Sequence, residues 1–279
     1  MTAAPSARPG AALVARLRAA GCVFAEDEAR LLRGAARTPA DLAGMVDRRV
    51  AGEPLEHIVG WAEFCGLRIA VDPGVFVPRR RTEFLVRQAV ELGRRPEPSP
   101  PPPVVVDLCC GSGAVGAALA ALLHRIELHA VDVDPAAVRC ARRNVAASGG
   151  RVYQGDLYEP LPATLRGRVD ILIANAPYVP TAELGLLPPE ARLHEPRVAL
   201  DGGADGLAVQ RRVIAAAPRW LRPGGHLLIE TSGQEAGRTA AACRRSGLVP
   251  SVATFDDLEA TVVIGVRTHA VRSARRSRG

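Results

Sequence analysis

The sequence predicts an α/β fold, in which a largely parallel, seven-stranded sheet covered by helices follows a small helical domain that ends in a β-hairpin. From residue 104 onward, short apolar strand segments alternate with helical segments, which is typical of a parallel sheet with helices on both faces. The last two strand segments are separated by only four residues, 256–259. They must pair antiparallel, because a parallel connection needs about a dozen residues or more.

The first 72 residues carry helical patterns before any strand pattern. Apolar spacing predicts a helix over residues 11–20, and residues 26–36 form a second candidate helix. The β-branched and aromatic residues around Gly60 and Gly66 predict a short β-hairpin over residues 58–71. Between the second helix and this hairpin, a third helix is expected to begin at Pro39, with Thr38 as its N-cap. We therefore expect an N-terminal domain over residues 1–72.

The remaining chain, residues 73–267, is expected to form the second domain. It opens with a helix over 82–93 that Thr82 would cap, and a proline-rich, stiff connector follows at 96–103. Strands are then predicted over residues 104–108, 126–134, 152–154, 169–175, 226–231, 249–255 and 260–267. An alanine-rich helix is expected after the first strand and should end near residue 123. Three further helices are expected over residues 135–147, 209–220 and 237–246.

Composition excludes several classes of protein. The six cysteines show neither a metal-ligand spacing nor a disulfide framework, so we expect no metal site and reduced thiols in a cytoplasmic protein. No apolar run is long enough to span a membrane, and the N-terminus lacks the pattern of a secretory signal. The net charge of +7 arises mainly from five arginines at and beyond Arg267. We therefore expect a basic, disordered tail over 268–279 and no stable nucleic-acid binding.

A glycine-containing turn follows the first strand of the second domain. Its residues are Asp107, Cys109, Cys110, Gly111, Ser112 and Gly113. The glycines allow a tight turn close to a ligand, and Asp132 at the end of the next strand is placed to accept hydrogen bonds from ribose hydroxyls. Acids at the ends of both strands, with the turn between them, indicate S-adenosylmethionine (AdoMet) as the ligand. After the third strand, Asp156 would then lie near the adenine amine and Leu157 against the ring.

The tetrapeptide Asn175-Ala176-Pro177-Tyr178 follows the fourth strand and points into the same crevice. An Asn-x-Pro turn can be purely structural. The chain has only two asparagines, however, and one of them stands here. The Asn175 side-chain oxygen and the Ala176 carbonyl can each accept a hydrogen bond from one NH2 group, while Tyr178 stacks on its plane. This pattern therefore favours a site for a planar nitrogen.

The tetrapeptide resembles the (N/D)PP(Y/F/W) motif of AdoMet-dependent methyltransferases that act on planar nitrogens. Other stretches resemble the HemK/PrmC family of protein-(glutamine-N5) methyltransferases, which modify peptide-chain release factors. These stretches are EPLEHIVGWAEFCGLRIAVDPGVFVPRRRTE (53–83), DLCCGSGAVGAALA (107–120), GDLYEPL (155–161), ILIANAPYVP (171–180) and HEPRVALDGGADGL (194–207). The resemblance covers about residues 13–267.

The resemblance implies a Rossmann-like, class I AdoMet-dependent methyltransferase fold whose last strand is antiparallel. It implies transfer of a methyl group to the N5 nitrogen of a glutamine in the GGQ loop of a release factor, with S-adenosyl-L-homocysteine as product. Asn175, Ala176, Pro177 and Tyr178 would be the catalytic residues. The N-terminal domain would recognise the protein substrate, and the enzyme is expected to be a monomer.

Three departures from the family pattern stand out. Ala176 occupies a position that is usually proline, and Arg79-Arg80-Arg81-Thr82-Glu83 replaces the usual Arg-Pro-Glu-Thr-Glu run. Cys109 and Cys110 stand where the glycine loop usually reads GT or GS.

Other functions remain open at this point. One is methylation of an exocyclic amine on a nucleic-acid base, which the near-neutral body and the few aromatic residues disfavour. Another is an N-methyltransferase of specialised metabolism derived from the same family. A third is a non-catalytic AdoMet-binding or ribosome-associated protein, which the intact tetrapeptide argues against.

Overall fold

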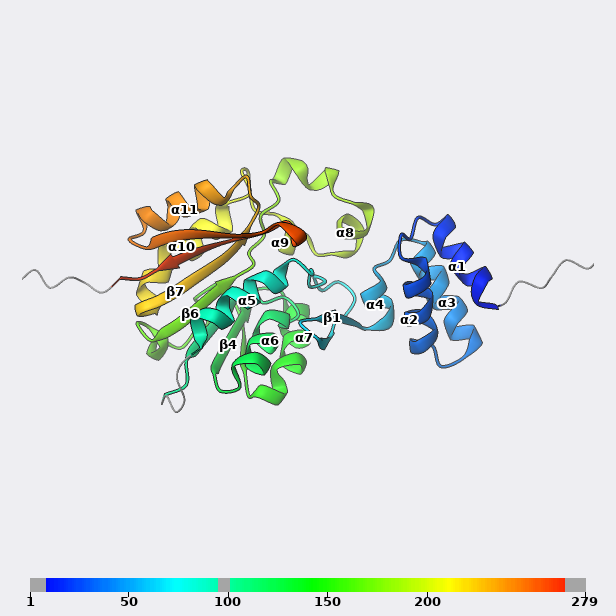
Figure 1. The fold of residues 1–279 in the computed structure, drawn as a ribbon, viewed down its shortest axis with the longest axis horizontal. Helices are drawn as coiled ribbons and strands as arrows, with labels where there is room; N and C mark the ends of the chain where they lie inside the picture. The colour runs from blue at the N-terminus through cyan, green and yellow to red at the C-terminus, as the bar shows by residue number, and fades with distance from the viewer. Residues whose placement is uncertain (1–8, 95–100, 269–279) are drawn as a thin grey trace, which may run out of the picture.

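The computed structural model describes residues 9–94 and 101–268. Predictions for the tail beyond 268 and for most of the proline-rich connector lie outside these residues. Within them, the N-terminal helices lie at one end of the molecule and the large sheet at the other (Figure 1). No helix in the described ranges is long and apolar enough to cross a membrane.

Four helices form the N-terminal part of the structure: α1 (Pro9–Ala19), α2 (Ala25–Ala35), α3 (Pro39–Val50) and α4 (Leu55–Val59). They bury an apolar cluster of their own, which includes Leu17, Leu32, Val46 and Ile58. The predicted cap of α3 is confirmed, because the Thr38 hydroxyl accepts a hydrogen bond from the Asp41 amide at 3.1 Å.

The hairpin lies where the sequence predicts it, but it begins later. Its strands are β1 (Trp61–Phe64) and β2 (Leu67–Ala70), which pair antiparallel. Residues 58 and 59 belong instead to α4, which ends at Gly60 in the left-handed conformation (φ 83°). Five residues are too few to show a helical period in the sequence, so this helix was missed.

The prediction for Thr82 was wrong. Helix α5 (Thr82–Gly93) has Arg81 as its N-cap residue, and no side chain caps it. Thr82 is instead the first residue of the helix and is 3% exposed. Its hydroxyl is used elsewhere, in the site described below.

The seven-stranded sheet is confirmed, with the order β5-β4-β3-β6-β7-β9-β8. Its strands are β3 (Val104–Leu108), β4 (Glu127–Asp132), β5 (Arg151–Gln154), β6 (Val169–Ala174), β7 (Leu221–Thr231), β8 (Val249–Phe255) and β9 (Ala260–Val266). Strands β3 to β7 pair parallel, and β9 is antiparallel to both β7 and β8. Strand β7 begins five residues earlier than the expected 226, because its start pairs with Val169 ahead of a register shift.

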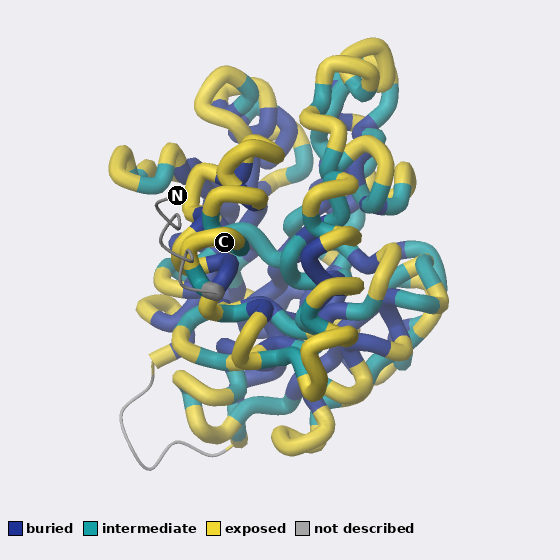
Figure 2. Tube along the Cα trace, turned by 90° about the vertical axis from the view of Figure 1, so that its right-hand side faces the viewer, coloured by how far each residue is buried: buried dark blue, intermediate teal, exposed yellow. Residues whose placement is uncertain are grey.

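Helices cover both faces of this sheet. Successive side chains of a strand point to opposite faces, and most strand residues here are apolar, so both faces must be covered. On one face, α5, α6 (Ala114–Leu123) and α7 (Pro135–Val145) pack on Val105, Ile171 and Ile173. On the other, α10 (Ala208–Trp220) and α11 (Ala236–Arg245) pack on Val106, Leu172 and their neighbours. Figure 1 shows the sheet between its two layers of helices, and Figure 2 shows the buried parts of the chain inside and the exposed parts outside.

A long excursion separates β6 from α10. It contains a 3-10 helix, η3 (Thr181–Leu186), and the short helices α8 (Pro189–His194) and α9 (Arg197–Leu200). Three further 3-10 turns lie at Ala146–Ser148, Ala163–Leu165 and Asp256–Leu258. The excursion starts at the carboxyl end of a central strand, which is the edge of the sheet where open α/β folds bind ligands.

Candidate active site

A cavity of about 860 Å³ opens at the carboxyl ends of β3, β4 and β6. Nine of the predicted site residues line it: Cys109, Gly111, Asp132, Asp156, Leu157, Asn175, Ala176, Pro177 and Tyr178. Asp107, Cys110, Ser112 and Gly113 do not line it. The structure therefore brings the two predicted motifs together around one cavity and leaves four residues of the glycine turn behind its wall.

The turn after β3 has the backbone that its glycines allow. Gly111 and Gly113 have φ values of 54° and 77°, and Cys109 adopts 57° although it is not glycine. A Cβ atom at Gly113 would lie 3.0 Å from the Cα atom of Ala141, so α7 packs directly on the turn. Cys109, at a position where the family usually has glycine, lines the cavity.

Asp132 holds this turn from the neighbouring strand. Its Oδ2 accepts a hydrogen bond from the Gly111 amide at 2.8 Å, and its Oδ1 accepts one from the Asp134 amide at 2.9 Å. Burial raises the pKa of the Asp132 carboxyl, and these two hydrogen bonds oppose the rise. The carboxyl is thus fixed at the rim of the cavity, where it could accept further hydrogen bonds from a ligand.

Asp107 lies deeper, beneath the turn. It is 2% exposed, and its Oδ2 accepts a hydrogen bond from the Gly116 amide at 3.1 Å. Burial raises the pKa of this carboxyl to about 7. Asp107 therefore joins the end of β3 to the first turn of α6 and supports the loop from behind.

Asp156 and Leu157 line the cavity on the β5 side. Leu157 is buried and has a positive φ of 50°. The Asp156 carboxylate is paired with Arg212 of α10 at 2.5 Å. Arg212 itself lines the cavity, and sequence reasoning did not find it.

The tetrapeptide sits opposite the glycine turn. The Asn175 side-chain nitrogen donates to the Thr82 hydroxyl oxygen at 3.3 Å. Since Asn175 lines the cavity and no described residue is hydrogen-bonded to its Oδ1, that oxygen remains available to a ligand. The Tyr178 hydroxyl accepts from Arg81, whose guanidinium lies 5.7 Å from the ring centroid. Burial raises the pKa of Tyr178, so it stays a neutral phenol.

The excursion after the tetrapeptide packs back on it through glycines. Val179 exchanges two backbone hydrogen bonds with this stretch: its amide donates to Leu200, and its carbonyl accepts from Gly202 at 2.8 Å. A Cβ atom at Gly206 would lie 2.5 Å from the Tyr178 carbonyl oxygen. Only a residue without a side chain fits there, which explains the glycines in the 194–207 stretch.

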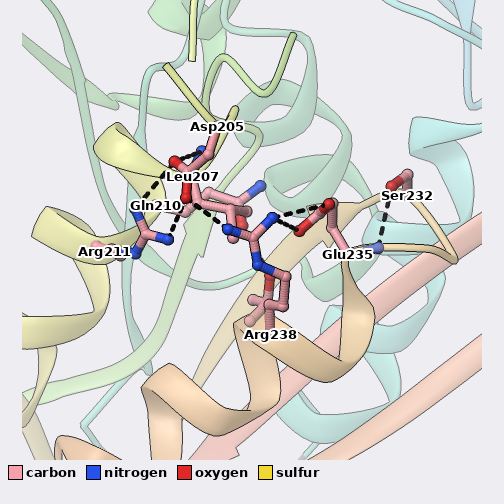
Figure 3. Close-up of polar contacts among 8 residues, drawn as sticks. Asp205, Leu207, Gln210, Arg211, Ser232, Glu235 and Arg238 are labelled. Carbon is pink, nitrogen blue, oxygen red and sulfur yellow. Dashed lines mark hydrogen bonds and ion pairs between the residues drawn. The ribbon is translucent and has the colours of Figure 1, made fainter. Parts of the chain in front are cut away.

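Ion pairs anchor the far end of the excursion. Asp205 pairs with Arg211 of α10 and Arg238 of α11, each at 2.5 Å, and Arg238 also pairs with Glu235 (Figure 3). These cationic partners hold the pKa of the Asp205 carboxyl well below its usual range. The excursion is thus tied at one end to Tyr178 and at the other to two helices of the sheet domain.

A second link ties the excursion to the chain between hairpin and α5. The Glu195 side chain is 1% exposed and accepts hydrogen bonds from Arg79 at 2.6 and 2.7 Å. Sequence reasoning missed both residues as part of the cavity wall or its support. The signal lay in the two stretches 53–83 and 194–207, which contain this pair.

The residues fit AdoMet. The carboxyl groups of Asp132 and Asp156 can accept hydrogen bonds from a ligand, and apolar surface from Val131, Leu157 and Val209 suits an aromatic ring. On the other side of the cavity, the Ala176 carbonyl and the Asn175 amide oxygen lie next to the Tyr178 ring in the chain. The arrangement suits a cationic, ring-bearing ligand beside a planar NH2 group.

Fold and site together define an AdoMet-type methyltransferase architecture, and the comparisons agree. The family described as "Methyltransferase small domain" matches residues 68–186. A methyltransferase of Pyrococcus furiosus has the same fold, with a TM-score of 0.54, 15% identity, and coverage of 81% of this chain and 100% of that one.

Relatives that are similar over most of this chain indicate a more specific family. A release factor glutamine methyltransferase of Geobacter sulfurreducens is 40% identical over 82% of this chain and 79% of its own. One from Streptomyces coelicolor is 42% identical over 70% and 68%. The chain therefore belongs to the release factor glutamine methyltransferase family and is a methyltransferase. A 4-amino-L-phenylalanine/4-methylamino-L-phenylalanine methyltransferase of Streptomyces pristinaespiralis is also 39% identical, over 72% and 69%.

Proposed function

We propose that this enzyme transfers a methyl group from AdoMet to the side-chain N5 nitrogen of a glutamine in a peptide-chain release factor. One observation carries the proposal: the Asn175 side chain and the Ala176–Pro177–Tyr178 turn line the same cavity as Asp132 and the glycine turn. The family membership of the chain supports glutamine as the acceptor and the release factor as the partner.

AdoMet supplies an electrophilic methyl group on a sulfonium. We assign the ribose to Asp132 and the ring to the side of Leu157, with Asp156 near the adenine amine once its pairing with Arg212 loosens. The Asp132 carboxyl has no cationic partner among the described residues and, when ionised, favours a cationic ligand, whereas the charge of Asp156 is compensated by Arg212. The product, S-adenosyl-L-homocysteine, lacks that positive charge and would be held less tightly.

An amide nitrogen is a poor nucleophile because its lone pair is delocalised, so orientation is what the enzyme must provide. Asn175 Oδ1 and the Ala176 carbonyl accept the two N–H bonds, and Tyr178 packs on the amide plane. These contacts align the nitrogen and offset the positive charge that grows on it. No strong base is required, since the methylated nitrogen is strongly acidic and loses its extra proton to water.

Ala176 in place of proline leaves this mechanism intact. The group that acts is its main-chain carbonyl, and Pro177 still restricts residue 176 to an extended backbone. Ala176 is 1% exposed and belongs to the apolar cluster beneath the cavity that also contains Leu172 and Ala174.

We assign recognition of the protein substrate to the N-terminal domain, residues 1–72, with residues 73–267 as the catalytic domain. Arg49 in α3 is hydrogen-bonded to Glu190 of α8 at 3.1 Å, and Glu190 lines the cavity. The N-terminal helices therefore reach the cavity wall and are placed to guide a protein loop into it. Release factors act in the cytoplasm, which is where we place this enzyme.

A second acceptor class has one observation in its favour. The relative from Streptomyces pristinaespiralis is named for methylation of an aromatic amine, which also presents a planar NH2 group. The same two acceptors and the Tyr178 ring would hold such a group.

The experiment offers labelled AdoMet with purified release factors, a release factor whose GGQ glutamine is alanine, ribosomal RNA and 4-amino-L-phenylalanine. We expect label on the intact release factors alone, located on the GGQ glutamine by mass spectrometry. Label on the amine or the RNA, with none on the release factors, would overturn the proposal.

A further inference from the structure

Glu230, at the end of β7, is a buried carboxylate that the methyl transfer itself does not use. It is 3% exposed, and neither side-chain oxygen has a hydrogen bond within residues 9–94 and 101–268. A buried carboxylate of this kind is costly and normally has donors. Its main chain is fixed, since the Gln210 side chain (labelled in Figure 3) donates to the Glu230 carbonyl at 3.4 Å.

Two consecutive residues at the start of α5 face this carboxylate. Arg81 Nε lies 3.5 Å from Oε1, and interactions with Thr82 and Arg81 both lower the pKa of Glu230 against the rise that burial causes. The charge of Arg81 therefore favours the ionised form. Ionised, Glu230 can only accept hydrogen bonds, and the Thr82 hydroxyl has a proton to donate.

Thr82 connects this carboxylate to the proposed catalytic residue. It is buried, and its oxygen accepts from Asn175 Nδ2 at 3.3 Å. A hydroxyl oxygen that accepts from one neighbour must direct its single proton to another. The Glu230 carboxylate interacts with the Thr82 side chain and has no other hydrogen-bond donor among the described residues, so it is the acceptor for that proton.

We propose that Glu230 and Thr82 are positioning residues that decide which end of the Asn175 side-chain amide faces the acceptor nitrogen. The Glu230 carboxylate accepts a hydrogen bond from the Thr82 hydroxyl, and the Thr82 oxygen accepts one from Asn175 Nδ2. Asn175 Oδ1 is then left to accept a hydrogen bond from the substrate. The opposite orientation would set two NH2 groups against each other, and the substrate amide would lose one acceptor. This inference rests on the proposed planar-nitrogen acceptor.

Arg81 connects the Glu230 carboxylate to a second side chain that we assign to the acceptor site, that of Tyr178. It contacts Glu230 and also donates to the Tyr178 hydroxyl. One short segment, residues 81–82, thus holds both Asn175 and Tyr178. Arg81 stands where the family usually has glutamate, and in this chain it is the counter-ion of Glu230.

The orientation can be read without catalysis, because the chain has two asparagines, Asn144 and Asn175. Isotope-labelled asparagine gives two side-chain amide signals by NMR, and Asn175→Ala assigns them. We expect the Asn175 NH2 hydrogens to exchange at least tenfold faster in Thr82→Val and in Glu230→Gln. Thr82→Ser should restore slow exchange, while the Asn144 signal stays unchanged in every variant.

Kinetics provide the second readout, on whichever acceptor the wild type methylates. Thr82→Val should lower kcat by about 10- to 100-fold, the range for misplacing a reacting group, with AdoMet affinity within about twofold. In an Asn175→Ala background, Thr82→Val should add no further loss, because it acts through Asn175. Thr82→Ser separates this effect from damage to the fold.

Two results would overturn the inference: unchanged Asn175 exchange in Thr82→Val, or an equal loss of kcat from Thr82→Val in both backgrounds. A wild-type enzyme that methylates no release factor while the exchange pattern holds would contradict the proposed substrate and leave the positioning device supported.

Discussion

Asn144 of α7 donates a hydrogen bond to the Ser112 carbonyl oxygen at 2.8 Å, and the same side chain pairs with both main-chain groups of Ala70 at 2.9 Å. The last residue of the hairpin is thereby joined to the glycine turn at the cavity. One side chain, the second of the two asparagines, couples the segment that follows the N-terminal domain to the loop that we assign to AdoMet.

Asn144→Ala should therefore weaken both the fold and the cofactor site. The Ser112 carbonyl and the Ala70 amide lose this partner, while the Ala70 carbonyl keeps the hydrogen bond from the Cys140 thiol at 2.9 Å. We expect the free energy of unfolding to fall by about 2–3 kcal/mol, within the range for leaving buried polar groups unsatisfied. AdoMet affinity, measured by calorimetry, should fall several-fold. Asn144→Asp keeps the bond from the Ala70 amide and should be intermediate in stability. AdoMet affinity at the wild-type value in the alanine variant would show that the coupling does not reach the site.

Gly206→Ala should disturb Tyr178 although it lies outside the tetrapeptide. Gly206 has a φ of 73°, and a Cβ atom there would lie 2.5 Å from the Tyr178 carbonyl oxygen. We expect a destabilisation of about 1–3 kcal/mol and a fall in kcat as the Tyr178 ring shifts. Gly185→Ala in the same excursion is the control, because nothing lies within 4 Å of its Cβ position. Equal kcat in the two variants would rule out the packing argument.

Asp132→Ala should weaken AdoMet binding by about 1–3 kcal/mol, the range for hydrogen bonds to a charged group. The variant loses the carboxylate that we assign to the ribose, and the Gly111 amide loses the hydrogen-bond acceptor that holds the glycine turn. Asp47→Ala serves as the control, since Asp47 is 62% exposed and pairs with Arg16 far from the cavity. Calorimetry with identical AdoMet affinities for wild type and Asp132→Ala would contradict the assignment.

Asp107 should give the fold a measurable pH dependence. Its folded-state pKa of about 7 exceeds the usual carboxyl value, so the folded state holds the proton more tightly than the unfolded state. The contribution of Asp107 to the free energy of unfolding is fully present below about pH 4 and is lost as the pH rises through about 7. Asp107→Asn should flatten this slope by up to ~1.4 kcal/mol per pH unit, while its side-chain oxygen can still accept from Gly116. Urea denaturation across pH 4–8 measures it, and parallel curves for the two proteins would count against the raised pKa.

The sheet and its strand order follow from patterns that are local in sequence. Alternating strand and helix segments and the four-residue link before β9 suffice to predict a parallel sheet with an antiparallel end. Asn175 and Asp132 could be placed at the cavity because each directly follows or ends a recognisable strand.

What could not be predicted depends on contacts between distant residues. Helices α8 and α9 have six and four residues, too few to show a helical period, so these two helices of the excursion could not be predicted from the spacing of apolar residues. Thr82 looked like a helix cap because its spacing suits one, yet its partner Asn175 lies 93 residues away. Arg212, which pairs with Asp156, likewise gave no sign of its place in the cavity.

Three substitutions in the tetrapeptide, measured as single-turnover rates of methyl transfer to the unmethylated release factor, test the central claim most directly. We expect Asn175→Ala to lose orders of magnitude in rate, because one of two acceptors is gone and a poor nucleophile is misplaced. Asn175→Asp keeps an acceptor and should be intermediate, and Ala176→Pro keeps the carbonyl and should stay close to wild type. A near-normal rate for Asn175→Ala would contradict the account, whatever the other two variants do.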